Sequence, residues 1–158
     1  MKLADAVTVH NGKEPKARAG EVPVFAIGGQ QGFTDRSITD VPVIAIGIQG
    51  TVGKPRIFTP PVWLTSTQKF LEPVHCDLWY LLAVLENLPW DYFTVDGSVL
   101  KSLSERFWDI ELKHSHREQK HIGQYYRQLC QEYEKEKEIV RRLKETKNQM
   151  LNKCFPQG

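Results

Sequence analysis

The chain has 158 residues, of which 41% are hydrophobic and 25% charged, so it can form a core for one ordinary domain and is not a disordered tail. Its net charge is +2, but residues 1–70 carry eight Lys or Arg against five Asp or Glu, whereas residues 71–100 carry five acids and no Lys or Arg. No run approaches the ~18 apolar residues of a transmembrane helix, and the start lacks the apolar core of a signal peptide, so we expect a cytoplasmic protein with no membrane partner.

Residues 1–75 have the pattern of short strands and turns. Two apolar, β-branched runs, VPVFAIGG (22–29) and VPVIAIGIQG (41–50), each begin with Val-Pro and end in glycine. The stretch PRIFTPPVWLTSTQKFLEP (55–73) adds short extended pieces separated by proline. This pattern predicts a small twisted sheet with long loops.

The glycine-rich segment 47–55 is similar to a phosphate-binding P-loop only in part. A P-loop requires G-x-x-x-x-G-K followed by Ser or Thr, but Ile48 stands where the first glycine belongs and Pro55 follows Lys54. An ATPase or GTPase that uses the Gly53-Lys54 loop is therefore the weakest of the functional alternatives. We expect the glycines to let the chain turn sharply between two strands.

Two helices follow. Residues 76–88 are apolar on several faces and predict a buried helix that begins beside Asp77, whose charge complements the helix dipole. Ser115 and Glu118 have the spacing of a capping box, and a helix can run from there to about Cys154. Such a helix is on the order of 55 Å long, which is more than a small domain can cover, so it must leave the domain or lie along a partner.

The long helix carries a heptad seam. Its members follow alternating steps of four and three: Ile122, Tyr126, Leu129, Tyr133, Glu136, Val140, Leu143, Lys147, Met150 and Cys154. A parallel homodimer would bring Glu136 against Glu136, whereas an antiparallel pair centred between Val140 and Leu143 brings Glu136 against Lys147 of the other copy. The same register sets Tyr133 opposite Met150 and Leu129 opposite Cys154. We therefore predict antiparallel self-association; packing of the helix on its own domain is the alternative.

Taken in order, these segments resemble one half of the DNA specificity subunit of a type I restriction-modification system. Residues 2–35 resemble the opening of a target recognition domain, VPVIAIGIQGTVGKPRIF its central glycine-rich strand and turn, and DLWYLLAVLENL its helix. The segment 97–112 resembles the approach to the spacer helix, and residues 117–156 resemble the spacer helix itself. The family's proline-rich step before Glu-Gln is replaced here by Lys113-His114-Ser115-His116.

The resemblance implies that the loops bind double-stranded DNA. Lysine and arginine would contact phosphates, and glutamine amides would contact adenine in the major groove. The expected DNA-binding residues are Lys13, Lys16, Arg18, Gln30, Gln31, Arg36, Gln49, Lys54, Arg56, Gln68 and Lys69. A full-length specificity subunit has two recognition domains and two spacer helices, so the resemblance also implies that two copies of this chain pair to recreate it.

The sequence contains no catalytic constellation or cofactor motif that would indicate a function other than DNA binding. His114, His116 and His121 lie close together in the sequence, but no nearby acid or cysteine completes a metal-ligand set. The three cysteines have no Cys-x-x-Cys spacing, and we expect them to be reduced packing residues. We expect no metal, no cofactor and no catalytic activity of the chain's own.

The sequence thus predicts an α+β protein with a recognition domain (1–112) and a dimerisation helix (113–158) that forms an antiparallel coiled coil. The expected function is recognition of a bipartite, palindromic DNA site and the positioning of a methyltransferase subunit, with or without a restriction subunit. The alternative is a coiled-coil protein-interaction module, or a leftover recognition cassette, that does not bind DNA itself.

Overall fold

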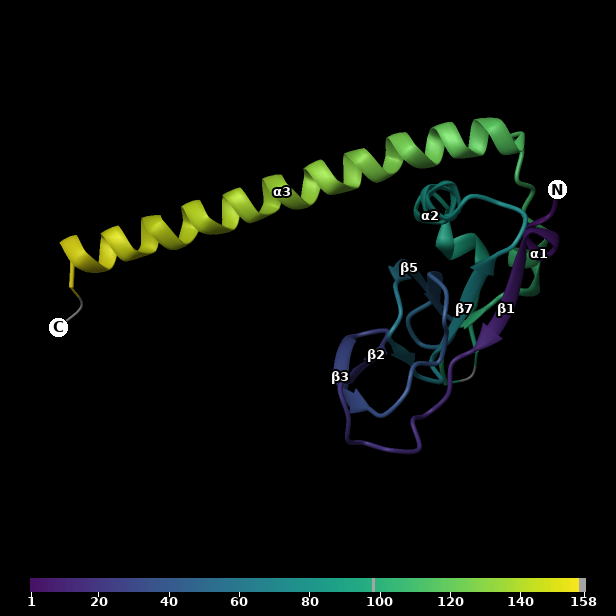
Figure 1. Cartoon of the computed structure of the whole chain (residues 1–158), viewed down its shortest axis with the longest axis horizontal. Helices are drawn as coiled ribbons and strands as arrows, with labels where there is room; N and C mark the ends of the chain where they lie inside the picture. Colours follow the sequence, from purple (N-terminus) through teal and green to yellow (C-terminus); the bar gives the residue numbers. More distant parts are fainter. Residues whose placement is uncertain (98, 157–158) are drawn as a thin grey trace.

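The computed structural model describes residues 1–97 and 99–156 of the chain. An α+β domain with several sheets carries one long helix that extends far beyond it (Figure 1), which confirms the predicted fold class. The N-terminus lies near the start of the long helix, and the C-terminus lies at its free end (Figure 1). None of the helices in the described ranges combines the length and apolarity needed to cross a membrane.

Two sheets form most of the domain. The larger is an antiparallel sheet of four strands in the order β1 (Val7–Asn11), β7 (Gln68–Pro73), β4 (Val43–Gly47) and β5 (Gly53–Phe58). The smaller sheet has three strands in the order β3 (Gly29–Thr34), β2 (Val22–Ala26) and β6 (Trp63–Leu64). A short hairpin of β8 (Thr94–Val95) and β9 (Ser102–Leu103) lies beside the segment that follows β4, where the Leu103 amide donates to the Ile48 carbonyl at 3.0 Å. The sequence predicted one sheet, whereas the described residues form two main sheets and a two-stranded hairpin.

The central strand β4 divides the interior into two cores. All five of its residues are buried, and successive side chains point to opposite faces of the sheet. Ile44 and Ile46 pack in the larger core, which includes α2. Val43 and Ala45 pack in the smaller core, which includes Leu64 of β6 and has Phe25 of β2 packed against it. A continuous apolar run is the pattern expected of a strand that is covered on both faces.

The predicted buried helix is α2 (Leu78–Glu86). Asp77 is its N-cap, and the Asp77 carboxylate accepts hydrogen bonds from the backbone amides of Trp79 and Tyr80, both at 2.9 Å. Short elements that the sequence analysis did not predict complete the domain: α1 (Leu3–Ala6), η1 (Trp90–Phe93) and η2 (Glu105–Asp109). The last two supply Phe93 and Phe107 to the larger core.

The long helix α3 (His116–Cys154) has 39 residues and begins at the predicted capping box. The Ser115 hydroxyl accepts from the Glu118 amide. The Glu118 carboxylate accepts from the Ser115 hydroxyl at 2.6 Å and from the Ser115 amide at 2.8 Å, and these two hydrogen bonds hold the pKa of Glu118 below its ordinary value. At ~1.5 Å per residue the helix is about 58 Å long. Only its first turns lie against the domain (Figure 1).

Two buried residues attach α3 to the domain. Gln119 is 2% exposed; its amide oxygen accepts from the Asp77 backbone at 3.3 Å, and its amide nitrogen donates to the His114 carbonyl at 2.9 Å. Gly123 faces the start of α2 so closely that an added Cβ would lie 2.0 Å from the Asp77 carboxylate. Glycine is a poor helix former, but the close approach of α2 means that the junction requires it at position 123.

Candidate nucleic-acid interface

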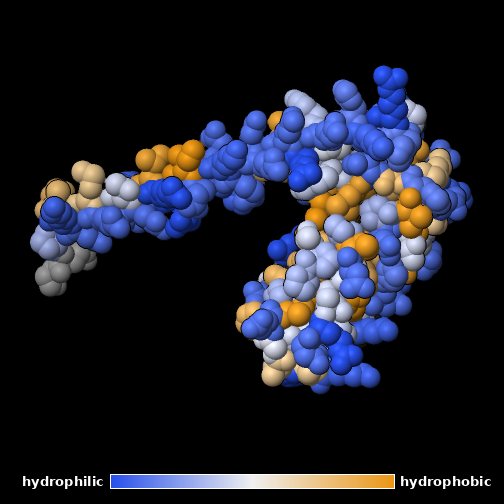
Figure 2. Space-filling view, viewed as in Figure 1, coloured by the Kyte–Doolittle hydropathy of each residue, from blue (hydrophilic) through white to orange (hydrophobic). Residues whose placement is uncertain are grey.

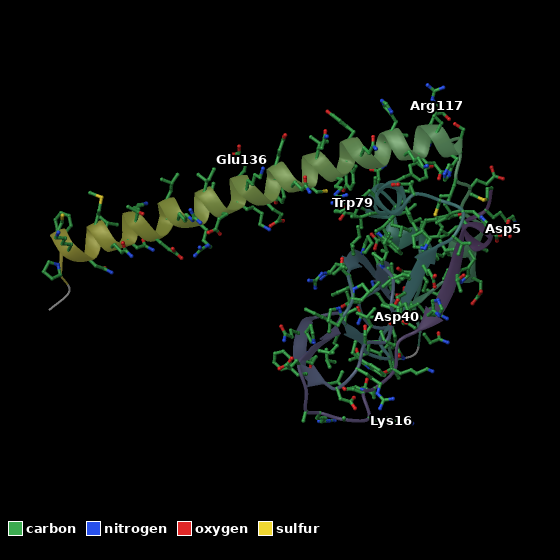
Figure 3. The ribbon with its side chains drawn as sticks, in the orientation of Figure 1. Asp5, Lys16, Asp40, Trp79, Arg117 and Glu136 are labelled. Carbon is green, nitrogen blue, oxygen red and sulfur yellow. The ribbon has the colours of Figure 1, made fainter. Side chains whose placement is uncertain are left out.

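The predicted DNA-binding residues lie mainly on three connections: the loop 12–21, the β2–β3 hairpin with the loop after it, and the β4–β5 hairpin. Figure 3 shows Lys16 at the end of the domain farthest from α3. The exposed members of the set are Lys13, Lys16, Arg18, Gln30, Gln31, Arg36, Gln49, Lys54 and Arg56. Their exposure leaves these side chains accessible to a ligand, as a DNA-binding surface requires.

The loop 12–21 is held by the domain at its start and at its middle. The Trp63 indole donates to the Lys13 carbonyl at 2.6 Å, and the Thr34 hydroxyl donates to the Ala17 carbonyl at 2.8 Å. The Lys13 amide donates to the Leu64 carbonyl at 3.0 Å. Gly12 lies so close to β-sheet backbone that a Cβ would be 2.0 Å from the Thr65 carbonyl oxygen. The loop is therefore preorganised by the domain.

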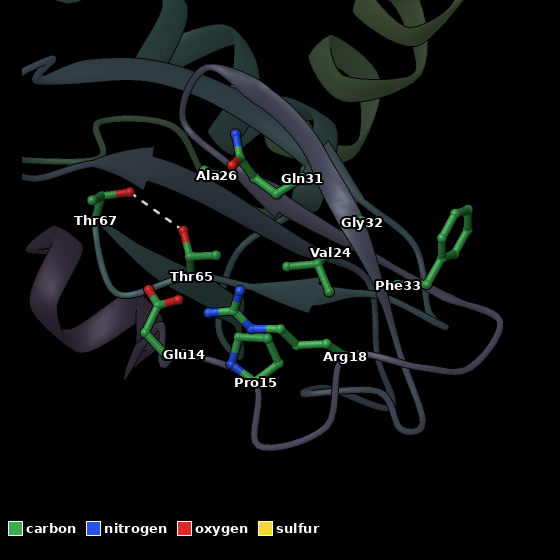
Figure 4. Close-up of a pocket in the computed structure, with 10 residues that line it drawn as sticks. All are labelled: Glu14, Pro15, Arg18, Val24, Ala26, Gln31, Gly32, Phe33, Thr65 and Thr67. Carbon is green, nitrogen blue, oxygen red and sulfur yellow. Dashed lines mark hydrogen bonds between the residues drawn. The ribbon is translucent and has the colours of Figure 1, made fainter.

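A bulge in β3 places Gln31 beside this loop. The pairing of β2 with β3 shifts between Val24 and Phe25, whose partners are Gly32 and Gln30, so Gln31 is the extra residue. A bulge changes the direction of its side chain relative to the regular alternation of a strand. Gln31 and Arg18 line the same hollow of about 480 Å³, which lies between the loop and β3 (Figure 4).

The glycine-rich segment forms a hairpin, as predicted. Strands β4 and β5 pair on either side of it, and Gly50 and Gly53 adopt positive φ values of 73° and 88°. A Cβ on Gly53 would lie 2.5 Å from the Trp90 ring, so this glycine is also required by packing. Lys54 has a positive φ of 51°, which is uncommon for a residue with a side chain, and its side chain is exposed.

Aromatic rings hold Arg56 at the surface. Its guanidinium carbon lies 5.3 Å from the centroid of Phe58 and 5.9 Å from the centroid of Phe25. A guanidinium over an aromatic face is attracted by the ring quadrupole, and its five donors stay free to meet phosphate oxygens. Arg36 is less free, because it is paired with Asp35 at 3.5 Å; the hydrogen bond lowers the pKa of the Asp35 carboxyl.

Two of the residues that were predicted to contact DNA are wholly or partly buried in the structure. Gln68 is 2% exposed, and its amide donates to the Phe25 carbonyl at 2.9 Å, so it joins the two sheets and cannot meet DNA. That prediction was wrong because Gln68 belongs to a strand whose position is set by pairing distant in sequence. Lys69 is half-buried on the same strand and donates to Asn11 at 2.9 Å.

The histidines near the start of α3 do not gather around a metal-binding set. The His114 ring nitrogen lies 3.0 Å from the Tyr80 hydroxyl and forms a hydrogen bond with it. Within residues 1–97 and 99–156 there is no group of three or more His, Cys, Asp or Glu arranged to hold a metal ion. His114 therefore helps to fix the start of α3 beside α2.

The free part of α3 carries an apolar stripe on one face. Residues three and four apart share a face of a helix, and the exposed residues at these spacings include Leu129, Tyr133, Val140, Leu143 and Met150. Figure 2 shows a hydrophobic patch on the part of α3 that lies beyond the domain. Ile139 and Leu151 border the same stripe and are also exposed. This apolar surface has no partner within the described part of the chain.

The first two seam residues contact the chain's own domain. Ile122 and Tyr126 are half-buried and pack against the larger core. The Tyr126 hydroxyl donates to Glu86 of α2, and burial raises the pKa of that hydroxyl, with Glu86 adding to the effect. For these two members of the predicted dimer seam, the alternative of packing on the chain's own domain therefore applies in the single chain, because the first part of the seam faces α2.

Ion pairs stabilise the polar side of the free helix. Glu138 accepts from Arg141 at 2.7 Å and from Arg142 at 3.0 Å, and these hydrogen bonds lower the pKa of Glu138 to about 2. Lys137 pairs with Glu134 at 3.1 Å. Pairs three and four residues apart support an isolated helix, so α3 can stay helical where the domain does not touch it.

Comparison with solved structures identifies the fold. The chain aligns over its full length with the S subunit of a type I restriction-modification system from M. genitalium, with a TM-score of 0.73 and 21% identity, and covers 46% of that chain. A chain from a structural study of complex assembly and conformational transition in the type I R-M system matches over 98% of this chain and 42% of its own, with a TM-score of 0.67 and 13% identity. No protein-family model and no curated protein matches the sequence. The chain spans less than half the length of the solved chains that it matches, and it has the fold of one half of a type I restriction-modification S subunit.

Proposed function

We propose that the chain is a sequence-specific DNA-recognition subunit of a type I restriction-modification system. The observation that carries the proposal is the full-length match to less than half of an S subunit. Residues 1–112 would be one recognition domain and residues 113–158 one spacer helix. Two copies would supply the two domains that a longer S subunit has in one chain, and twofold symmetry of the protein would demand a palindromic, bipartite site.

The unpartnered stripe on α3 supports self-association. Leu143 is 64% exposed, Met150 62% and Val140 47%, and these large side chains lie beyond the reach of the domain. Burying such side chains contributes about 1.5–3 kcal/mol each, so the stripe favours a partner helix. Because Glu136 and Lys147 interrupt the stripe on the same face, an antiparallel second copy is the partner that matches each with an opposite charge.

Cross-linking of native cysteines tests the antiparallel arrangement. With Leu129 opposite Cys154 of the second copy, Cys154 also lies beside Cys130, whereas the two Cys154 residues are about 38 Å apart at ~1.5 Å per residue. A short bis-maleimide should therefore join Cys130 of one copy to Cys154 of the other. Cys76 will not compete, because it is buried and burial raises the pKa of its thiol to about 11.

Single serine variants distinguish an antiparallel from a parallel dimer in the cross-linking experiment. Cys130→Ser and Cys154→Ser alone should each abolish the covalent dimer on a denaturing gel, and a mixture of the two variants should restore it. In a parallel dimer the identical residues would be neighbours, so either single variant would still cross-link. That pattern would contradict the antiparallel arrangement.

Charge reversal offers an independent test. Glu136→Lys replaces two Glu–Lys contacts of an antiparallel dimer by two Lys–Lys contacts, and we expect the dissociation constant to rise at least about tenfold. Adding Lys147→Glu to the same chain restores opposite charges and should restore dimerisation, as measured by sedimentation equilibrium at low salt. If the double variant is no tighter than the single one, Glu136 and Lys147 do not face each other.

The exposed basic loops support DNA binding by the domain. Phosphate contacts from residues such as Lys16, Lys54 and Arg56 would give affinity that falls with salt, since each neutralised phosphate releases bound counterions. Glutamines on the same connections would add contacts to base edges. The acidic segment 71–100 contributes no residue to these connections.

The function is tested by combining the chain with its methyltransferase subunit on DNA. We expect the complex to methylate an adenine at one bipartite site, which requires the partner subunit to extrude that base from the duplex. The methyltransferase subunit alone should show no site preference. A coiled-coil interaction module would dimerise but leave the methyltransferase without a preferred site, and a nucleotide-binding enzyme would bind ATP or GTP.

A further inference from the structure

Two side chains of opposite charge that form no ion pair with each other line the hollow between the loop 12–21 and β3. Arg18 and Glu14 both line it, and Figure 4 shows the Arg18 side chain extending across the hollow on the side of Glu14 and Thr65. Within residues 1–97 and 99–156, neither side chain forms an ion pair, and the only hydrogen bonds to the Glu14 carboxylate come from Ser66. A hydrogen-bond donor group and an acceptor group therefore face one exposed space.

The position of Glu14 is fixed by the domain. Its Oε1 atom accepts from the Ser66 hydroxyl at 2.9 Å and from the Ser66 amide at 3.5 Å, and its Oε2 atom has no hydrogen-bond partner in the described part of the chain. The backbone on either side is anchored, because the Lys13 carbonyl accepts from Trp63 and the Ala17 carbonyl accepts from Thr34. The free oxygen is thus presented at a defined place.

A carboxylate at this place is unfavourable for contact with phosphates. Glu14 lies between Lys13 and Lys16 on a loop whose other charged side chains, apart from Glu21 at its end, are basic, and phosphate oxygens would repel it. The repulsion is offset when the carboxylate meets a hydrogen-bond donor on the nucleic acid. In the major groove the amino groups of cytosine and adenine are the available donors, and carboxylates pair with the N4 amino group of cytosine.

Arginine pairs with the base opposite cytosine. Its guanidinium donates two parallel hydrogen bonds to O6 and N7 of guanine, which lie next to cytosine N4 on the major-groove edge of the same base pair. We propose that Glu14 and Arg18 together read one guanine–cytosine pair in each half-site. This inference rests on the proposed function. It gives an acidic residue a role in base recognition, although a negative charge by itself is unfavourable next to DNA phosphates.

The test uses the duplex that the full chain selects from a random pool. Once that site is known, each base pair of one half-site is replaced in turn, and the dissociation constant of each duplex is measured for the chain and its variants. Glu14→Gln keeps an oxygen for Ser66 but loses the charge, and Arg18→Lys keeps the charge but loses the two-pronged contact. We expect both variants to lose about tenfold or more of the discrimination at one and the same guanine–cytosine pair.

Two neighbouring residues serve as controls. Lys16→Ala, on the same loop, should weaken binding to all duplexes by a similar factor and leave discrimination unchanged. Glu21→Gln removes an exposed acid outside the hollow and should change neither. If Glu14→Gln and Arg18→Lys keep full discrimination, or relax different base pairs, the inference is overturned while the proposed function stands. If the unaltered chain selects no sequence, the proposed function fails and the inference falls with it.

Discussion

Leu143→Ala should raise the dissociation constant of the dimer by about a thousandfold. Leu143 is 64% exposed in the single chain and would lie opposite Val140 at the centre of the antiparallel pair. Truncating a buried leucine to alanine costs about 2 kcal/mol or more, and each dimer contains two copies of the side chain. Together this is about 4 kcal/mol, or three factors of ten in affinity. Light scattering over a dilution series measures the change directly.

The matched control for Leu143→Ala is Gln149→Ala, on the polar side of the same helix. It should leave the dimer unchanged, and neither variant should change the unfolding temperature of the recognition domain. Loss of the dimer should also weaken binding to a two-half-site duplex, since each half-site would then be bound by a separate molecule. An unchanged mass for Leu143→Ala at all concentrations would mean that the stripe on α3 does not form the dimer.

Gly123→Ala should destabilise the chain although alanine is the better helix former. In an exposed helix the change would be stabilising by about 1 kcal/mol. Here the new Cβ would lie 2.0 Å from the Asp77 carboxylate and 3.0 Å from the Tyr80 nitrogen. Asp77 would have to move, which breaks the N-cap of α2 and separates Ile122 from the core. We expect a net loss of about 2 kcal/mol and a melting temperature lower by roughly 5 °C.

A neighbouring substitution separates the clash from a change in helix propensity. Gln124→Ala alters the next residue of α3, which is exposed, and should leave the melting temperature within about 2 °C of the original. Calorimetry of the three proteins under identical conditions makes the comparison. A melting temperature for Gly123→Ala at or above the original would mean that α3 does not pack on α2 at the distance described.

Local patterns in the sequence predicted the helices best. The capping box of Ser115 and Glu118 and the acid before α2 are short-range signals, and both helices start where these signals lie. The apolar runs predicted β2 and β4 for the same reason. The division into two sheets depends on pairings distant in the sequence, such as β1 with β7 and β2 with β6, which no local pattern contains.

The differences between the predicted and the observed surroundings of the site residues have one physical origin, which is contacts that form only in the folded chain. Gln68 was assigned to DNA because glutamine is polar. However, β7 is paired with a strand on each side, and the Gln68 side-chain amide donates a hydrogen bond to the Phe25 carbonyl. Ile122 and Tyr126 fit the heptad seam, but they also face α2, and the seam pattern alone does not distinguish the two partners. Glu14 was not predicted as a site residue, because the geometry that links it to Ser66 and Arg18 appears only in the folded loop.

The most direct test of a symmetric DNA reader is the sequence of the duplexes that the chain retains. A random duplex pool is incubated with the dimeric chain, and the bound fraction is amplified and sequenced over several rounds. A symmetric dimer should select two identical half-sites in inverted orientation, separated by a gap of fixed length. Retention without sequence preference, or selection of a single asymmetric site, would contradict recognition by a symmetric dimer.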